Sequence, residues 1–331
     1  MTTKNHRLFI EFRTLLAVSL IFGLSILCML RVFGYDRDYF SYLKFYEKIS
    51  FGGYSGRFEP GFHFISNLFK ALMGHDSFTI YLFFLALISL FPKFMILRKT
   101  RNYVLMMFIY AMLIMPIHEM TQVRISLACG VMYWALYLVV NNKIGYFKRS
   151  IWILIGLSFH YSSIIFAPLI LFVEIFYKRS KLLVISYPIF ISGFIGMSIN
   201  YIVTIIPIID FYLTQSVTLN ELGLNNINPW SSRNIIFLIL IMIGFFNLNH
   251  LPKKMLPWFS VSVMGLALWY SFMWLPVFAH RFLELTIFSY LVWIPSLPYT
   301  SRIPCLILLM ILGLYFFYRM IFLNPIFMTT L

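Results

Sequence analysis

The stretch TLLAVSLIFGLSILCML, from Thr14 to Leu30, decides the fold class of this chain. Comparable apolar runs recur along the sequence, for example at 79–97 and 235–248. None of them alternates between apolar and polar residues, as a strand of a membrane β-barrel must. Because every backbone amide in the hydrocarbon core of a bilayer must be hydrogen-bonded internally, these runs are predicted to form transmembrane helices.

The overall composition excludes an ordinary soluble protein. Apolar residues make up 61% of the sequence and charged residues only 11%. In soluble domains, about half of the residues are apolar and about a quarter are charged. The formal net charge is +15, but much of it lies in loops on one side of the predicted membrane, where it meets anionic lipid head groups. Membrane lipid is therefore the expected partner of this charge, and no nucleic acid is implied.

The sequence predicts an all-α polytopic membrane protein with about ten or eleven transmembrane helices. Basic residues lie both before and after the pair 146–160 and 162–177, so the apex between these two spans is expected on the opposite side. The same rule places the N-terminus, as an uncleaved anchor, in the cytoplasm. The predicted spans are residues 14–32, 77–97, 103–117, 120–140, 146–160, 162–177, 182–208, 233–248, 256–278, 281–297 and 303–321.

One transmembrane domain is expected over 1–331, with two outer loops that break the apolar pattern. The second loop, 209–232, is polar and nearly uncharged, which suggests a lid or a sugar-facing segment. The first loop, 31–76, is acidic and contains two amphipathic stretches that are predicted to lie along the membrane surface. Their apolar stripes are Tyr39, Tyr42, Phe45 and Tyr46, and Phe62, Ile65, Phe69 and Leu72.

Ionisable residues at the outer ends of the predicted spans mark the candidate site, because charges within a bilayer are costly. Arg124 follows the outer hairpin that begins at His118, and it can point into the bundle or reach outward to the head groups. His160 stands at the apex between two spans, either as a functional group or as a packing residue. Arg281 opens a late span.

No metal or cofactor is indicated by the sequence. His280 with Glu284, and Glu59 with His63, are spaced by four residues and share a helix face, but two ligands are too few for a metal site. The cysteines lie in apolar runs, and neither a P-loop nor a dinucleotide-binding fingerprint is present.

The chemistry of these residues suits transfer of a sugar from a lipid diphosphate. Paired arginines bind phosphate oxygens bidentately and stay charged at any working pH. A carboxylate from the acidic first loop suits deprotonation of an acceptor hydroxyl. By the predicted topology, both kinds of group lie on the outer side of the membrane.

Several segments, in order along residues 34–290, resemble the EpsG/Wzy-type polymerases of bacterial surface polysaccharide. Thr121 stands where that family often has Asn before the Gln of its third segment. The segments that carry the resemblance are Asp36-Arg37-Asp38-Tyr39-Phe40-Ser41-Tyr42, Phe58-Glu59-Pro60-Gly61-Phe62, Gln122-Val123-Arg124-Ile125-Ser126-Leu127-Ala128, Phe159-His160-Tyr161-Ser162-Ser163 and Arg281.

The resemblance implies a polymerase in a GT-C-like helical bundle at the periplasmic face of the bacterial inner membrane. It would join oligosaccharide repeat units carried on undecaprenyl diphosphate, for O-antigen, capsule or exopolysaccharide, and it admits a chain-length regulator protein as a further partner. The expected site residues are Arg124 and Arg281 on the diphosphate, His160 orienting or protonating beside it, a base among Asp38, Asp36 and Glu59, and substrate contacts from Gln122, Tyr161 and Glu119.

Two other functions compete with this hypothesis. A transporter or flippase of lipid-linked oligosaccharide predicts inverted repeats and ionisable groups near the midplane of several helices, which the sequence does not reveal. A membrane enzyme of another kind is the second rival: an acyltransferase that modifies the polysaccharide would transfer a labelled acyl group to the glycan, and a glycosyltransferase with a monophosphate lipid donor would act on single-sugar polyprenyl phosphates.

Overall fold

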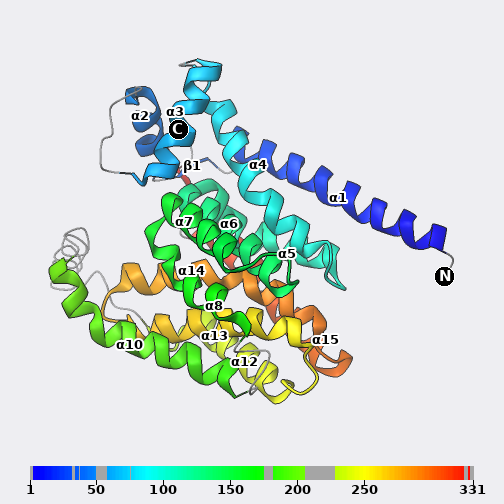
Figure 1. Cartoon of the computed structure of the whole chain (residues 1–331). Coiled ribbons are helices and arrows are strands. Elements are labelled where there is room, and N and C mark those ends of the chain that lie inside the picture. The colour runs from blue at the N-terminus through cyan, green and yellow to red at the C-terminus, as the bar shows by residue number, and fades with distance from the viewer. Residues whose placement is uncertain are drawn as a thin grey trace. The chain divides into compact units, whose positions relative to one another are not determined.

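A computed structural model describes residues 3–31, 34–36, 38–49, 58–74, 76–174, 182–205, 228–323 and 327–328. Nearly all of these residues are helical (Figure 1). Together with their apolar character, this confirms the predicted fold class of an all-α polytopic membrane protein. Most of the predicted second outer loop, 209–232, lies outside the described residues.

The chain forms two compact units, and each is described by itself. Unit 1 comprises Met1–Leu171 and Leu309–Leu331, and unit 2 comprises Phe172–Leu308. Whether the chain acts as one domain stays a prediction. Helix α15 (Tyr299–Tyr318) belongs to both units.

The elements of unit 1 include most of the residues singled out in the sequence. They are α1 (Thr3–Leu30), β1 (Tyr35–Asp36), α2 (Tyr39–Lys48), α3 (Pro60–Met73), α4 (Phe78–Leu97), α5 (Tyr103–Leu113), the π-helix η1 (Pro116–Thr121), α6 (Val123–Val140), α7 (Tyr146–Phe159), the 3-10 helix η2 (Tyr161–Phe166), α8 (Ala167–Leu171), the π-helix η5 (Arg319–Leu323) and β2 (Phe327–Met328).

Unit 2 is built from helices alone in its described part. They are α10 (Leu183–Ile205), α12 (Ser232–Phe246), η3 (Lys253–Met255), α13 (Leu256–Ser271), α14 (Pro276–Trp293), η4 (Ile294–Ser296) and the beginning of α15.

Each predicted span falls on a helix of the described chain. Within the described chain, six of the eleven predicted spans fall outside the helices that are long and apolar enough to cross a membrane: four lie on shorter apolar helices, and two lie on α7 and α13. The number of membrane crossings therefore stays a prediction. The predicted break between 146–160 and 162–177 is present, because α7 ends at Phe159 and His160 is extended before η2 begins. Among the described residues, five helices are long and apolar enough to cross a membrane, namely Glu11–Leu30, Phe78–Leu97, Val123–Val140, Pro276–Ser296 and Tyr299–Leu323.

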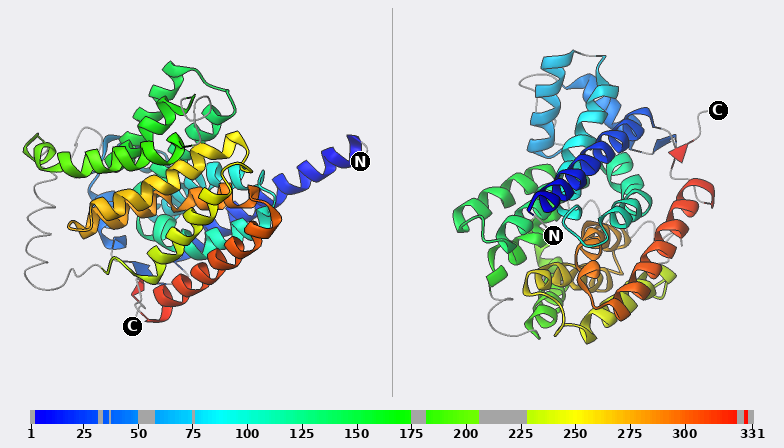
Figure 2. Two further views of the ribbon diagram at one scale, coloured as in Figure 1. Left: turned by 90° about the horizontal axis from the view of Figure 1, so that it is seen from below. Right: turned by 90° about the vertical axis from the view of Figure 1, so that its right-hand side faces the viewer.

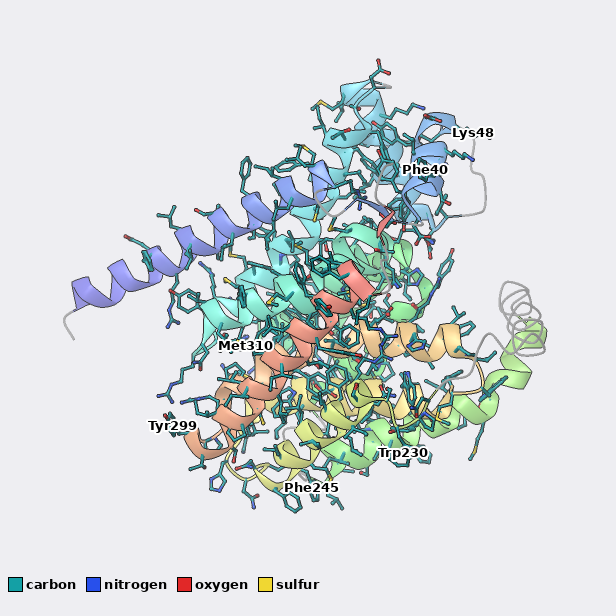
Figure 3. All side chains as sticks on the ribbon, turned by 180° about the vertical axis from the view of Figure 1, so that it is seen from behind. Phe40, Lys48, Trp230, Phe245, Tyr299 and Met310 are labelled. Carbon is teal, nitrogen blue, oxygen red and sulfur yellow. The ribbon has the colours of Figure 1, made fainter. Side chains whose placement is uncertain are left out.

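The two amphipathic stretches of the first loop are helices, as predicted, but their aromatic stripes face the protein. Tyr42, Tyr46, Phe62 and Phe69 are buried in one cluster with residues of α4 and α6. Aromatic rings bury large areas, so packing α2 and α3 against these helices removes these four rings from any lipid surface, whereas Leu72 of the second stripe is 73% exposed. We expect the opposite sides of these helices to contact the membrane surface, and Phe40 of α2 is exposed there (Figure 3).

Gly61 allows α3 to pack closely against the end of α7. A Cβ atom at this position would lie 2.8 Å from the backbone oxygen of Ser158, nearer than real Cβ contacts come. Since Ser158 lies two residues before His160, this close approach brings the start of α3 to the apex between α7 and η2.

A short antiparallel pairing joins the end of the chain to the beginning of the first loop (Figure 2). Tyr35 of β1 pairs with Met328 of β2, and Asp36 pairs with Phe327. The C-terminal segment is therefore part of unit 1, beside the acidic first loop.

Candidate functional site

Glu59 lies between two cationic or protonatable partners from different helices. Its Oε2 is 2.6 Å from Nη1 of Arg124, and its Oε1 is 2.7 Å from Nδ1 of His160. The side chains of Glu59 and His160 are 6% and 8% exposed, whereas that of Arg124 is 21% exposed. Three residues that are far apart in the sequence thus form one cluster, the Glu59 cluster, and Arg124 lies inside the protein rather than reaching outward to head groups.

Local structure explains how the three side chains meet. Glu59 precedes Pro60, which fixes the first position of α3, and the extended backbone of Glu59 lies just outside the helix. Arg124 lies in the first turn of α6, and its guanidinium stacks over the ring of Phe58 at 4.8 Å. His160 interrupts the helix between α7 and η2. All three positions are therefore at helix ends.

The Glu59 carboxyl group is held in its ionised form. Burial by itself would raise its pKa, but the hydrogen bond from His160 and the charge of Arg124 outweigh burial and lower the pKa of Glu59 to about 2. Since an ionised carboxylate only accepts hydrogen bonds, Nδ1 of His160 carries the proton that is shared with Glu59.

The other two carboxylates proposed as bases differ from each other in burial. Asp36 is 0% exposed, and its Oδ2 is 3.0 Å from Nη1 of Arg31. Burial raises the pKa of Asp36 to about 6, although the charge of Arg31 opposes this rise. Asp38 is exposed, and its backbone N–H donates to Asp36 at 2.9 Å. Both carboxylates lie near Tyr42, as does Arg124, since all three shift the pKa of that tyrosine.

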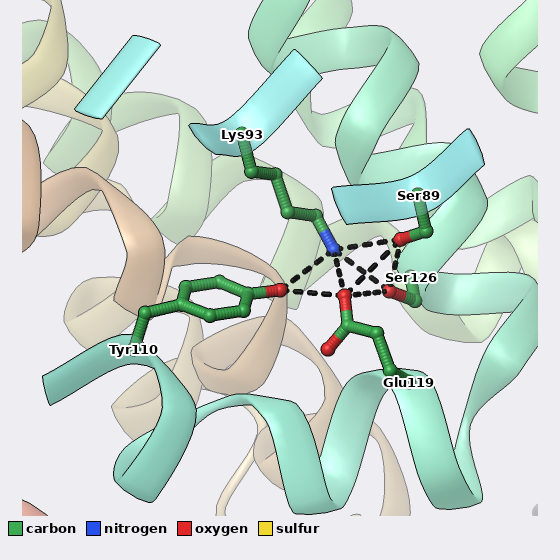
Figure 4. A network of polar contacts seen from close by, with 5 residues as sticks. All are labelled: Ser89, Lys93, Tyr110, Glu119 and Ser126. Atoms are coloured by element: carbon green, nitrogen blue, oxygen red, sulfur yellow. Dashed lines mark hydrogen bonds and ion pairs between the residues drawn. The ribbon is translucent and has the colours of Figure 1, made fainter. Parts of the chain in front are cut away.

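A second polar network lies entirely inside unit 1 (Figure 4). Nζ of Lys93, in α4, is 2.7 Å from Oε1 of Glu119, and both side chains are 0% exposed. Tyr110 and Ser126 also donate to that oxygen, at 2.5 and 2.7 Å. Lys93 in turn donates to Ser89 and Ser126, at 3.0 and 2.7 Å. A buried charge pair needs such additional hydrogen bonds to offset its desolvation.

This network anchors the turn that leads to Arg124. Glu119 belongs to the π-helix η1, and the carbonyl of the next residue, Met120, accepts a hydrogen bond from Arg31. The turn is therefore fixed from two sides, by Lys93 of α4 and by Arg31, which also binds Asp36. π-helical turns are often found at functional sites. Here the turn sets the position of Arg124, four residues after Met120.

Sequence reasoning missed Lys93 and Arg31, because a single charge is easily overlooked in a long apolar run. An ionisable residue within a predicted span was the signal that would have pointed to Lys93. The structure gives Glu119 and Asp36, predicted as substrate and base residues, buried protein partners in Lys93 and Arg31. Gln122 and Tyr161 flank Arg124 and His160 in the chain, and Tyr161 is 53% exposed. Their substrate contacts stay predictions.

Arg281 lies in α14 of unit 2, whereas Arg124 lies in unit 1. The pairing of these two arginines around one diphosphate therefore stays a prediction. Next to Arg281, Nδ1 of His280 lies 2.8 Å from Nη2 of Arg233 and accepts its hydrogen bond. Within the part of the chain that the structure describes, no group of three or more His, Cys, Asp or Glu side chains is placed to hold a metal ion.

The shifted pKa values of Asp36 and Glu59 predict opposite effects of pH on stability. The pKa of Asp36 is raised from 3.8 to about 6, so its favourable contribution is present below about pH 4 and is lost as the pH rises through 6. The pKa of Glu59 is lowered from 4.5 to about 2, so its contribution is present above pH 4.5 and is lost as the pH falls through 2.

We therefore expect Asp36→Asn to abolish part of the stability change between pH 4 and 6, and Glu59→Gln to abolish part of the change below pH 4.5. Apparent melting temperatures of detergent-solubilised protein between pH 2.5 and 8 measure both effects. A wild-type profile from Asp36→Asn over pH 4–6 would contradict the raised pKa of Asp36.

The fold and this site define a polytopic helical membrane protein with a buried carboxylate, imidazole and guanidinium cluster at its helix ends. The EpsG family model matches residues 14–329, so the chain belongs to the EpsG family, which confirms the resemblance seen in the sequence. This is a family of Wzy-type polysaccharide polymerases, and membership is consistent with a glycosyltransferase of the polymerase type. No curated protein and no solved structure matches the chain, and the GT-C-like arrangement stays a prediction.

Proposed function

We propose that this protein polymerises oligosaccharide repeat units that are linked to undecaprenyl diphosphate. The observation that carries the proposal is the Glu59 cluster, in which an ionised carboxylate holds an imidazole at 2.7 Å and a guanidinium at 2.6 Å. An imidazole with a fixed tautomer suits removal of a proton from an acceptor hydroxyl. A guanidinium suits a diphosphate leaving group.

In the proposed reaction, His160 is the general base. Its Nδ1–H donates to Glu59, so Nε2 accepts the proton of the acceptor hydroxyl as the hydroxyl oxygen bonds to the anomeric carbon of the donor sugar. The bond between that carbon and the diphosphate oxygen breaks, and the diphosphate leaves with the electron pair. Glu59, with a pKa of about 2, is too weak a base at neutral pH and serves to orient His160. Asp38 is the alternative base, because its carboxylate is exposed.

Arg124 is assigned to the diphosphate of the donor, together with Arg281 of unit 2. One Nη atom of Arg124 binds Glu59, which leaves further N–H groups of a partly exposed guanidinium for phosphate oxygens. No soluble cofactor takes part in this scheme.

The proposed orientation of the chain in the membrane follows from the positions of its basic loops. The N-terminus lies in the cytoplasm of a bacterium, the chain crosses the inner membrane repeatedly, and the Glu59 cluster opens toward the periplasm. The product is an O-antigen, capsule or exopolysaccharide, and a chain-length regulator protein is a proposed partner.

A gel of surface polysaccharide tests the proposal. The gene is deleted in the source bacterium and complemented with the wild-type or Arg281→Ala version. A ladder that collapses to a single repeat, and returns only with the wild type, supports both the polymerase and the role of Arg281. An intact ladder in the deletion strain would refute polymerisation, and loss of even the single repeat would indicate export or an earlier glycosyl transfer instead.

A further inference from the structure

Two serine hydroxyls beside His160 lack the hydrogen bonds that buried serines make elsewhere in this protein. Among the described residues, Ser162 and Ser163 are the only serines or threonines whose buried side-chain oxygen has no hydrogen-bond partner. In contrast, Ser25, Ser66 and Ser192 donate to the carbonyl four residues earlier, at 2.7 to 2.8 Å.

The break in the helix at His160 explains why Ser162 and Ser163 do not donate to the carbonyl four residues earlier. Residues four positions before Ser162 and Ser163 belong to α7, which ends at Phe159, while both serines belong to η2. The backbone N–H of Ser163 donates to the backbone carbonyl of His160 at 3.1 Å, which ties the serine turn to the main chain of His160. An unpaired buried hydroxyl is unfavourable, and such groups in native proteins call for an explanation.

We propose that Ser162 and Ser163 bind hydroxyl groups of the acceptor sugar, an inference that rests on the proposed polymerase function. A serine hydroxyl both donates and accepts, as a sugar hydroxyl does, whereas phosphate oxygens mainly accept. Ser162 and Ser163 lie two and three residues after His160, the proposed base, beside which the reacting acceptor hydroxyl must lie. The diphosphate belongs with Arg124, on the other side of Glu59.

A structural role and a substrate role predict opposite results for alanine substitutions. If the hydroxyls bind only substrate, Ser162→Ala and Ser163→Ala remove an unpaired polar group and leave the melting temperature unchanged or raise it. Each loses one hydrogen bond to the acceptor, so the KM for the lipid-linked repeat unit is expected to rise roughly threefold to tenfold, and more in the double variant. Ser162→Thr keeps a hydroxyl and is expected to restore most of the affinity.

Ser25→Ala is the matched control, because Ser25, like Ser163, is fully buried in unit 1 but bonds to its own helix at 2.8 Å. It is expected to lower the melting temperature and to leave KM unchanged. The assay uses purified protein and the lipid-linked repeat unit that accumulates in the deletion strain. An unchanged KM in the double variant, or a clear loss of stability in either single variant, would overturn the inference while the polymerase function stands. A wild-type protein that extends no repeat unit would overturn both.

Discussion

Replacing Glu59 with glutamine is expected to lower polymer formation about a hundredfold or more, while the protein still accumulates in the membrane. The carboxylate accepts from Arg124 and His160 at 2.6 and 2.7 Å. A glutamine of the same shape has only one oxygen and turns its N–H groups toward the second donor, so it cannot hold both. The tautomer of His160 and the position of Arg124 are therefore disturbed together.

The measurement is polymer length and yield in the complemented deletion strain, with protein quantified in the membrane fraction. Glu47→Gln is the matched control, because Glu47 is exposed on α2 in the same loop. It should leave the polymer unchanged. Wild-type polymer from a well-expressed Glu59→Gln variant would show that the Glu59 cluster is not the site of transfer.

Lys93→Met is expected to destabilise the protein by about 3–5 kcal/mol, because it leaves the Glu119 carboxylate buried without its counter-charge. The double variant Lys93→Met/Glu119→Met removes both charges together and should recover most of this loss. It should nevertheless stay poorly active, since η1 loses its link to α4 and Arg124 loses a fixed position.

Apparent melting temperatures and the yield of monodisperse protein in detergent measure this effect. Lys99→Met serves as control, because Lys99 is exposed in the turn just after α4 and its loss should change stability by less than about 1 kcal/mol. If Lys93→Met unfolds no earlier than Lys99→Met, the buried pair does not stabilise the fold as described.

The helices were predictable from the sequence because each needs only a continuous apolar run. The break at His160 was predictable too, since basic residues lie on both sides of the pair of spans. The aromatic stripes of α2 and α3 correctly predicted two helices. The predicted contact of these rings with lipid was wrong, because an apolar helix face has the same sequence pattern whether lipid or protein covers it. Burial of Tyr46 against Tyr81, with ring centroids 4.8 Å apart, depends on a helix that begins thirty-two residues later.

The candidate site was only partly predictable. Charge at helix ends pointed to Arg124, His160 and Glu59, and the fold brings these three together. Their direct bonding depends on close packing of α3 on α7 at Gly61, which no local pattern reveals. For the same reason the partner of Glu119 was missed, because Lys93 lies twenty-six residues earlier on a different helix.

Synthesis imposes an order on the completion of unit 1. The strand partner of Tyr35 and Asp36 is Phe327–Met328, which the ribosome makes after all of unit 2. The acidic first loop must therefore wait, with β1 unpaired, until residues 327 and 328 have been made. A chain that stalls after unit 2 would hold Glu59, Arg124 and His160 but lack the part of unit 1 that begins at Leu309, so unit 1 is completed only after unit 2 has been made.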